Sequence, residues 1–167
     1  MKPYTLLIIT DNIELRVRLE AYFGSISVIK LLPSAVDGMS GVVQARMLEP
    51  DLMLLDMLMP RMDGIAVLRS LRAENICLNT RIFALSSMKG EEAVQLGESL
   101  GVTYQIQMPT DESLIFSRMM DFAPDREGLL QTYRMSIREN DLTLQIDQIV
   151  TSLLRHMGCP VSLTGYY

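Results

Sequence analysis

Short apolar runs alternate five times with segments of helical hydrophobic spacing, and this alternation limits the possible folds more than any other feature of the sequence. The first run, residues 5–9, is continuously apolar, which is typical of a strand buried on both faces of a parallel sheet. The predicted strands are residues 5–9, 27–32, 52–55, 81–85 and 104–107. Asp11 or Asn12 can cap a first helix that ends at Gly24, and later helices are predicted at 39–48, 65–73, 91–100 and 111–122.

Strands that alternate with helices form parallel sheets joined by right-handed crossovers, with helices on both faces. We therefore predict an α/β, flavodoxin-like, doubly wound sheet of five parallel strands in the order 2-1-3-4-5. Sites in such sheets lie beyond the carboxyl ends of the strands, at the switch point between the first and third. Asp11 and Asp56 stand at those two ends, so we expect them to be neighbours.

The chain has 167 residues, 49% of them hydrophobic, which suits one well-buried domain and a short extension. We expect a domain over residues 1–123, a polar connector over 124–140 and a helical tail over 141–167. Six apolar residues of the tail recur at helical spacing: Ile146, Ile149, Val150, Leu153, Leu154 and Met157. We expect this stripe to dock on the domain or to pair with a second chain.

Charge and cysteine content disfavour several classes of protein. The net charge is −5 and no basic face stands out, which argues against nucleic-acid binding. Cys77 and Cys159 have no partner at metal-ligand spacing, so we expect neither zinc nor a disulfide framework, as suits the cytoplasm. The N-terminal apolar run is short and lacks a cleavage site, so we interpret it as a strand and expect no membrane attachment.

The predicted acid pair has a chemistry of its own. Two carboxylates about 4 Å apart repel by roughly 4 kcal/mol at an effective dielectric constant near 20, so they require a shared proton or a cation. Oxygen ligands favour Mg²⁺, which would help Asp56 to act as a nucleophile towards a phosphoryl group. The alternative is purely structural, with Asp11 as a helix cap and Asp56 as a residue of the strand end.

Three motifs carry a family resemblance: Ile-Ile-Thr-Asp-Asn at residues 8–12, Leu-Leu-Asp-Met-Leu-Met-Pro-Arg-Met-Asp-Gly at 54–64, and Ala-Leu-Ser-Ser at 84–87. Through them, residues 4–122 resemble the receiver domain of two-component response regulators. The resemblance implies that Asp56 is the phosphoacceptor, that Mg²⁺ is held by Asp11, Asp56 and the carbonyl of Leu58, and that Ser86 senses the phosphate. A histidine kinase or a phosphotransferase is the implied partner.

Within that family, the chain is most similar to the regulators of sporulation. Residues 149–166 are similar to the first helix and turn of their DNA-binding effector domain. The recognition helix would lie past the last residue, so we expect no direct DNA binding by these residues. The implied role is control of sporulation-type transcription through a homodimer.

Three positions depart from the receiver pattern. Thr10 stands in place of an acid, Met108 in place of a lysine, and Gln105 in place of the switch aromatic. Asp11 and Asp56 without a lysine carry a formal charge of −2, and the usual three aspartates with one lysine would carry the same charge. We therefore expect a stable site with weak Mg²⁺ binding, slow phosphoryl transfer and an impaired switch. Lys89 is a possible substitute for the lysine, although a solvated loop residue is the simpler interpretation.

Two functions remain in competition. One is a switch that is phosphorylated at Asp56, and the other is a pseudo-receiver that mediates dimerisation or protein interaction without phosphate. An enzyme is not expected: haloacid-dehalogenase phosphatases also use a strand-end aspartate, but they require an acid two residues later, where this chain has Leu58.

Overall fold

The computed structural model describes residues 2–87 and 90–123. The expected connector at 124–140, the tail at 141–167 and Lys89 lie outside the described residues. Strands and helices alternate strictly along the described residues: β1 (Tyr4–Ile9), α1 (Ile13–Gly24), β2 (Ile29–Leu31), α2 (Gly38–Leu48), β3 (Leu52–Asp56), α3 (Gly64–Ala73), β4 (Arg81–Ser86), α4 (Glu91–Ser99), β5 (Tyr104–Gln107) and α5 (Glu112–Asp121).

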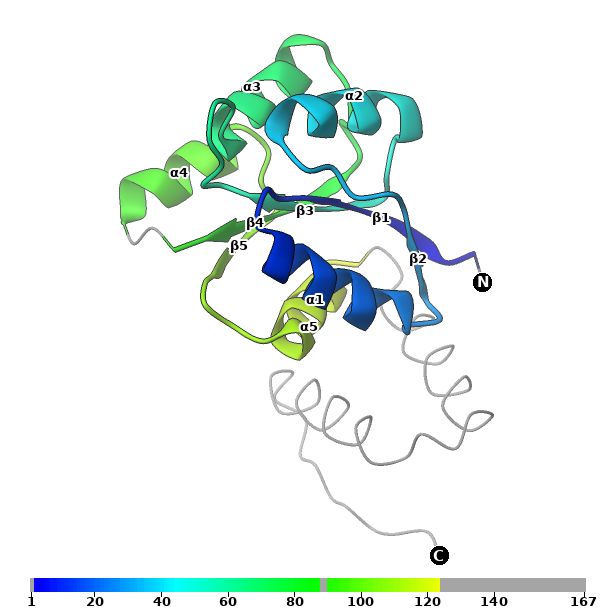
Figure 1. Cartoon of the computed structure of the whole chain (residues 1–167). Coiled ribbons are helices and arrows are strands. Elements are labelled where there is room, and N and C mark those ends of the chain that lie inside the picture. Colours follow the sequence, from blue (N-terminus) through cyan, green and yellow to red (C-terminus); the bar gives the residue numbers. More distant parts are fainter. Residues whose placement is uncertain (1, 88–89, 124–167) are drawn as a thin grey trace, which may run out of the picture.

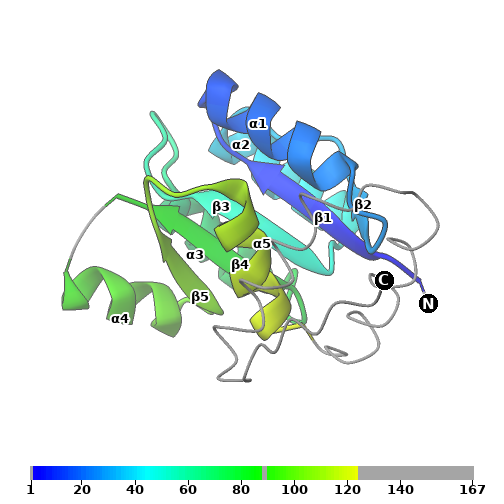
Figure 2. The same ribbon diagram turned by 90° about the horizontal axis from the view of Figure 1, so that it is seen from below.

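The strands form one parallel sheet in the order β2-β1-β3-β4-β5, which confirms the predicted fold class and strand order. Figure 1 shows α1 and α5 on one face of the sheet and α2 and α3 on the other, with α4 near the β5 edge. In the view from below, α1 and α5 lie in front of the strands (Figure 2). An ion pair joins these two helices, with Arg18 Nη2 2.5 Å from Glu112 Oε1.

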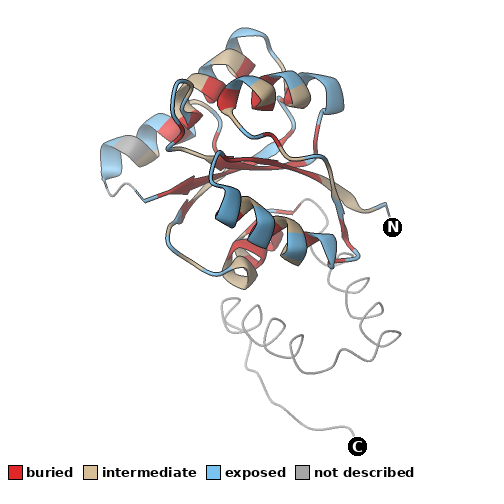
Figure 3. Ribbon diagram, viewed as in Figure 1, coloured by how far each residue is buried: buried red, intermediate tan, exposed pale blue. Residues whose placement is uncertain are grey.

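The central strands are buried on both faces, as Figure 3 shows by colour. Successive residues of β1 alternate between two cores: Leu6 and Ile8 pack under α1 and α5, whereas Leu7 and Ile9 pack under α2 and α3. All four are fully buried. Burying each such side chain stabilises the fold by about 1.5–3 kcal/mol, so two-sided burial explains why β1 is a continuous apolar run.

Polar residues after the strands start most of the helices. The side chains of Asn12, Asp37, Asp63 and Asp111 each accept a hydrogen bond, at 2.8–3.0 Å, from a backbone N–H in the first turn of α1, α2, α3 and α5. These caps satisfy donors that helix geometry leaves unpaired. The backbone and hydroxyl of Ser40 hold the pKa of the Asp37 carboxyl below its usual value.

The second strand is shorter than predicted: it covers Ile29–Leu31 and not the whole of residues 27–32. The N–H of Ile29 donates to the carbonyl of Ile26 at 3.0 Å and closes a turn over the residues between them. Ile26 and Val28 are nevertheless buried, so the apolar pattern records burial in a turn as well as in a strand.

The methionines around the third strand fill the core. Met53 and Met59 are buried, and Met57 and Met62 pack against the same cluster under α2 and α3. These four methionines therefore serve mainly to fill the core. Within residues 2–87 and 90–123, no helix is long and apolar enough to cross a membrane.

Candidate functional site

The carboxyl ends of β1, β3 and β4 meet at one edge of the sheet. Ile9 pairs with Leu55 in the parallel register, which brings the residues that follow them together. A surface pocket of about 440 Å³ lies there. It is lined by Asp11, Asn12, Leu15, Asp56, Leu58, Leu85, Ser87 and Met108. The structure thus places Asp11 and Asp56 in one pocket, as the strand ends predicted.

Both carboxylate oxygens of Asp56 accept a hydrogen bond. The hydroxyl of Thr10 donates to Oδ2 at 2.7 Å, and the backbone N–H of Leu58 donates to Oδ1 at 3.0 Å. Asp56 is half-buried and Asp11 is exposed. The carboxylate is therefore fixed in orientation while it still faces the pocket.

Thr10 is fully buried, and its hydroxyl has a second partner. The backbone N–H of Asn12 donates to Thr10 Oγ1 at 3.2 Å. The hydroxyl carries one proton, and Asp56 accepts it. Thr10, which stands in place of an acid of the family pattern, is thus a direct hydrogen-bond donor to the Asp56 carboxylate.

The oxygen donors of the pocket suit Mg²⁺ better than a transition metal. Asp11 and Asp56 supply carboxylates, and Leu58 also lines the pocket. Across residues 2–87 and 90–123, no group of three His, Cys, Asp or Glu side chains is arranged to hold a metal. Mg²⁺ needs no such cage, because it keeps several waters and is bound by one or two carboxylates plus phosphate oxygens.

The two serines at the end of β4 differ in position. Ser86 is 4% exposed, and its carbonyl accepts a hydrogen bond at 2.9 Å from the N–H of Met108. Ser87 is exposed and lines the pocket. The resemblance implied a role for Ser86 alone, although the motif Ala-Leu-Ser-Ser contains both hydroxyls.

Met108 occupies the pocket wall where the family pattern has lysine. Its partly buried side chain packs against the core under α1 and α5. Among the described residues, 2–87 and 90–123, no cation lines the pocket. A nearby cation that the sequence analysis missed is Arg16 of α1, whose Nη1 donates to the carbonyl of Thr10 at 3.4 Å.

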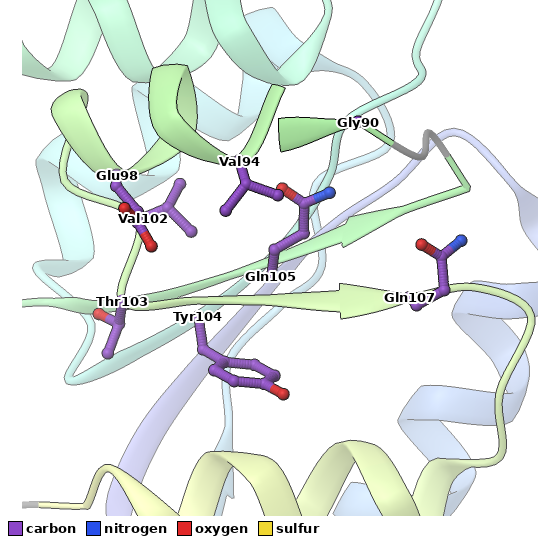
Figure 4. A pocket seen from close by; sticks show the side chains of 8 residues that line it. All are labelled: Gly90, Val94, Glu98, Val102, Thr103, Tyr104, Gln105 and Gln107. Atoms are coloured by element: carbon purple, nitrogen blue, oxygen red, sulfur yellow. The ribbon is translucent and has the colours of Figure 1, made fainter. Parts of the chain in front are cut away.

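Gln105 lies on β5 beside a second pocket of about 380 Å³, between β5 and α4. Figure 4 shows Gln105 on the same side of the strand as Val94, whereas Tyr104 points away towards α5. There the guanidinium carbon of Arg118 lies 5.7 Å from the Tyr104 ring centroid, and the Phe122 ring centroid lies 5.2 Å from it. The aromatic neighbour of Gln105 is thus held on the opposite face and does not replace the missing switch residue.

Comparison with known proteins agrees with this geometry. The family model of the response regulator receiver domain matches residues 6–119. Chemotaxis protein CheY4 of Vibrio cholerae is 20% identical over 72% of this chain and 99% of its own, with a TM-score of 0.67. The receiver domain of NarL from Mycobacterium tuberculosis is also 20% identical, over 72% and 96% of the two chains, with a TM-score of 0.66.

A third similar structure is a complex that contains BeF3 and Mg²⁺. It is the CheX–CheY–BeF3–Mg²⁺ complex of Borrelia burgdorferi, a chain of which is 26% identical over 72% of this chain and 89% of its own, with a TM-score of 0.65.

Proposed function

We propose that Asp56 is the phosphoacceptor of this chain, which belongs to the response regulator receiver domain family. Receiver domains are modules of two-component signalling and not enzymes. The observation that carries the proposal is the position of Asp56. Its carboxylate is oriented by hydrogen bonds from Thr10 and Leu58 and lines a pocket together with Asp11. The structural alternative made Asp11 the cap of the first helix, but Asn12 provides that cap, which supports a role for Asp11 in the pocket.

In the proposed reaction, a carboxylate oxygen of Asp56 forms a bond to phosphorus. The bond between phosphorus and the donor nitrogen of a phosphohistidine breaks, and the histidine leaves with that electron pair and takes up a proton. The product is an aspartyl phosphate, a covalent intermediate of the kind that carboxylates form in phosphoryl transfer. The donor is a histidine kinase or a phosphotransferase.

The chain's own residues prepare this step. Leu58 and Thr10 fix the direction of the carboxylate, and Asp11, Asp56 and the carbonyl of Leu58 would hold Mg²⁺. When bound, Mg²⁺ neutralises charge on the incoming phosphoryl group. Ser86 is proposed to sense the phosphate, although Ser87 is the serine that lines the pocket. The complex of the Borrelia burgdorferi protein with BeF3 and Mg²⁺ supports such a site in a similar chain.

The finer assignment is regulation of sporulation-type transcription, as in stage-zero sporulation protein A. Its support is the similarity of residues 149–166 to the start of that protein's effector domain. We propose residues 1–123 as the receiver, 124–140 as a connector and 141–167 as the beginning of an effector, with a cytoplasmic homodimer as the working form. DNA binding by these residues alone is not part of the proposal.

Intact mass spectrometry tests the acceptor assignment. The chain is incubated with acetyl phosphate and millimolar Mg²⁺, beside Asp56→Asn as the matched control. We expect the mass of one phosphoryl group to be added to the wild type and not to the variant. No addition to the wild type would remove the proposal.

A second candidate function is a pseudo-receiver that assembles without phosphate. It is favoured by Thr10, which donates a hydrogen bond to Asp56 without metal, and by Met108, which lines the pocket where the family pattern has lysine. Light scattering with and without beryllofluoride and Mg²⁺ separates the two functions. A molecular mass that changes with beryllofluoride supports the phosphorylated switch, and an identical dimer under both conditions supports the pseudo-receiver.

A further inference from the structure

We propose that the Thr10 hydroxyl, and not a divalent cation, holds the Asp56 carboxylate in the resting site. The inference rests on the proposed function only in treating Asp56 as the acceptor. The hydrogen bond between the two side chains, 2.7 Å from Thr10 Oγ1 to Asp56 Oδ2, is a feature of the fold itself.

The local geometry makes Thr10 a donor with a fixed direction. Its N–H donates to the carbonyl of Ala35 at 3.2 Å, and its hydroxyl oxygen accepts the N–H of Asn12. The side chain is fully buried, so water does not compete for the hydroxyl proton. A β-branched side chain also has few rotamers, and the hydroxyl is thus oriented before any ligand arrives.

The charges at this edge of the sheet also support a role for Thr10 in holding Asp56 without a cation. A third carboxylate at position 10 would repel both Asp11 and Asp56, and a cation or a shared proton would be needed to hold the three together. A neutral hydroxyl removes that repulsion and adds a hydrogen bond to a charged acceptor, which is among the stronger kinds. Threonine at position 10, in place of the acid of the family pattern, therefore reduces the need for a cation at Asp56.

Two consequences follow for the resting protein. Its stability should depend little on Mg²⁺, because Asp56 is already satisfied at both oxygens. Its affinity for Mg²⁺ should be lower than that of a variant with an acid at position 10. One additional negative charge about 4 Å from a divalent ion raises the affinity by about tenfold or more, even with the screening of bulk water.

The test is thermal and urea unfolding of the full chain, with and without MgCl2 and without any phosphodonor. Thr10→Val keeps the shape and removes the hydroxyl, and Thr10→Ser keeps the hydroxyl as the matched control. Losing a hydrogen bond to a half-buried charged group should lower the folded-to-unfolded ratio by about tenfold to hundredfold in Thr10→Val. Thr10→Ser should retain most of the wild-type ratio.

The same substitution in an Asp56→Ala background shows whether the loss comes from Asp56. There Thr10→Val should have a much smaller effect, because its partner is gone. Equal effects in both backgrounds, or a Thr10→Val variant as stable as wild type, would overturn the proposal.

Thr10→Asp completes the set by restoring the acid. It should melt below wild type without metal and recover with MgCl2, whereas the wild type changes little. A wild type that MgCl2 stabilises as strongly as Thr10→Asp would contradict the proposal. If Thr10→Asp does not fold, the valine and serine variants still decide the role of the hydroxyl. Phosphorylation is not measured here, so a failed acceptor assignment leaves this result intact.

Discussion

Replacing Met108 with lysine should turn a slow phosphoacceptor into a faster one. Met108 lines the pocket together with Asp11 and Asp56, and its N–H is anchored on the Ser86 carbonyl at 2.9 Å. Methionine and lysine are both unbranched, so the lysine stem can follow the path of the methionine and place its ammonium at the pocket. The substitution changes the formal charge of the pocket from −2 to −1.

The size of the gain follows from two opposing effects. An ammonium about 4 Å from one carboxylate is attracted by roughly 4 kcal/mol at a dielectric constant near 20, and part of this is lost to desolvation of the partly buried side chain. A preorganised donor to a developing oxyanion changes a rate by about 10²–10³. A lysine placed by substitution is less well oriented, so we expect phosphorylation to be about 10- to 100-fold faster.

The assay is the initial rate of phosphorylation by acetyl phosphate at fixed Mg²⁺, followed by intact mass. Met108→Leu is the matched control, because it conserves volume without adding charge. Unfolding of both variants in urea confirms that they remain folded. Equal rates for the lysine and leucine variants would refute the argument that the missing cation limits phosphoryl transfer.

Three further predictions concern the frame of the site. Gly41→Ala should lower the free energy of unfolding by about 1–3 kcal/mol in a urea titration, because its Cβ would lie 2.7 Å from Ile9 Cγ2; Gly24→Ala, with nothing within 4 Å, should lose no stability. Thr80→Val should cost about 1–3 kcal/mol, since it removes the 2.6 Å hydrogen bond to the Pro50 carbonyl, and a melting temperature equal to wild type would contradict this. Asp111→Ala should cost about 1 kcal/mol at pH 7, measured by urea unfolding, because it removes the cap of α5. Hydrogen bonds from Ser113 and Leu114 lower the pKa of the Asp111 carboxyl below 3.8. The stabilisation by the ionised cap is therefore present above pH 3.8 and is lost as the pH falls through the folded-state pKa. An Asp111→Ala variant that loses as much stability in acid as at pH 7 would contradict this prediction.

The fold could be predicted because its signal is local and repeated. Residues 6–9 are buried on both faces, and capping residues follow the strands, so the order of elements was readable from the sequence. The meeting of Asp11 and Asp56 followed from the carboxyl ends of two parallel strands. Residues 27–28 and 32 were predicted wrongly as strand; at 27–28 the reason is that burial in a turn gives the same apolar pattern.

The details of the site could not be predicted because they depend on side-chain direction across long sequence separations. Thr10 and Asp56 are 46 positions apart, and their hydrogen bond needs both the strand register and the threonine rotamer. The position of Ser87 on the pocket depends on how the chain leaves β4. The contact of Arg16 with the Thr10 carbonyl likewise requires the orientation of α1 on the sheet.

The most direct test of the account is to map the phosphorylated residue. The chain is treated with acetyl phosphate and Mg²⁺, the acyl phosphate is reduced with borohydride, and the peptides are sequenced by mass spectrometry. The account predicts that homoserine replaces aspartate at position 56 and at no other aspartate. Conversion of Asp11 or Asp63 in its place, or no conversion at all, would contradict the assignment of Asp56 as the phosphoacceptor.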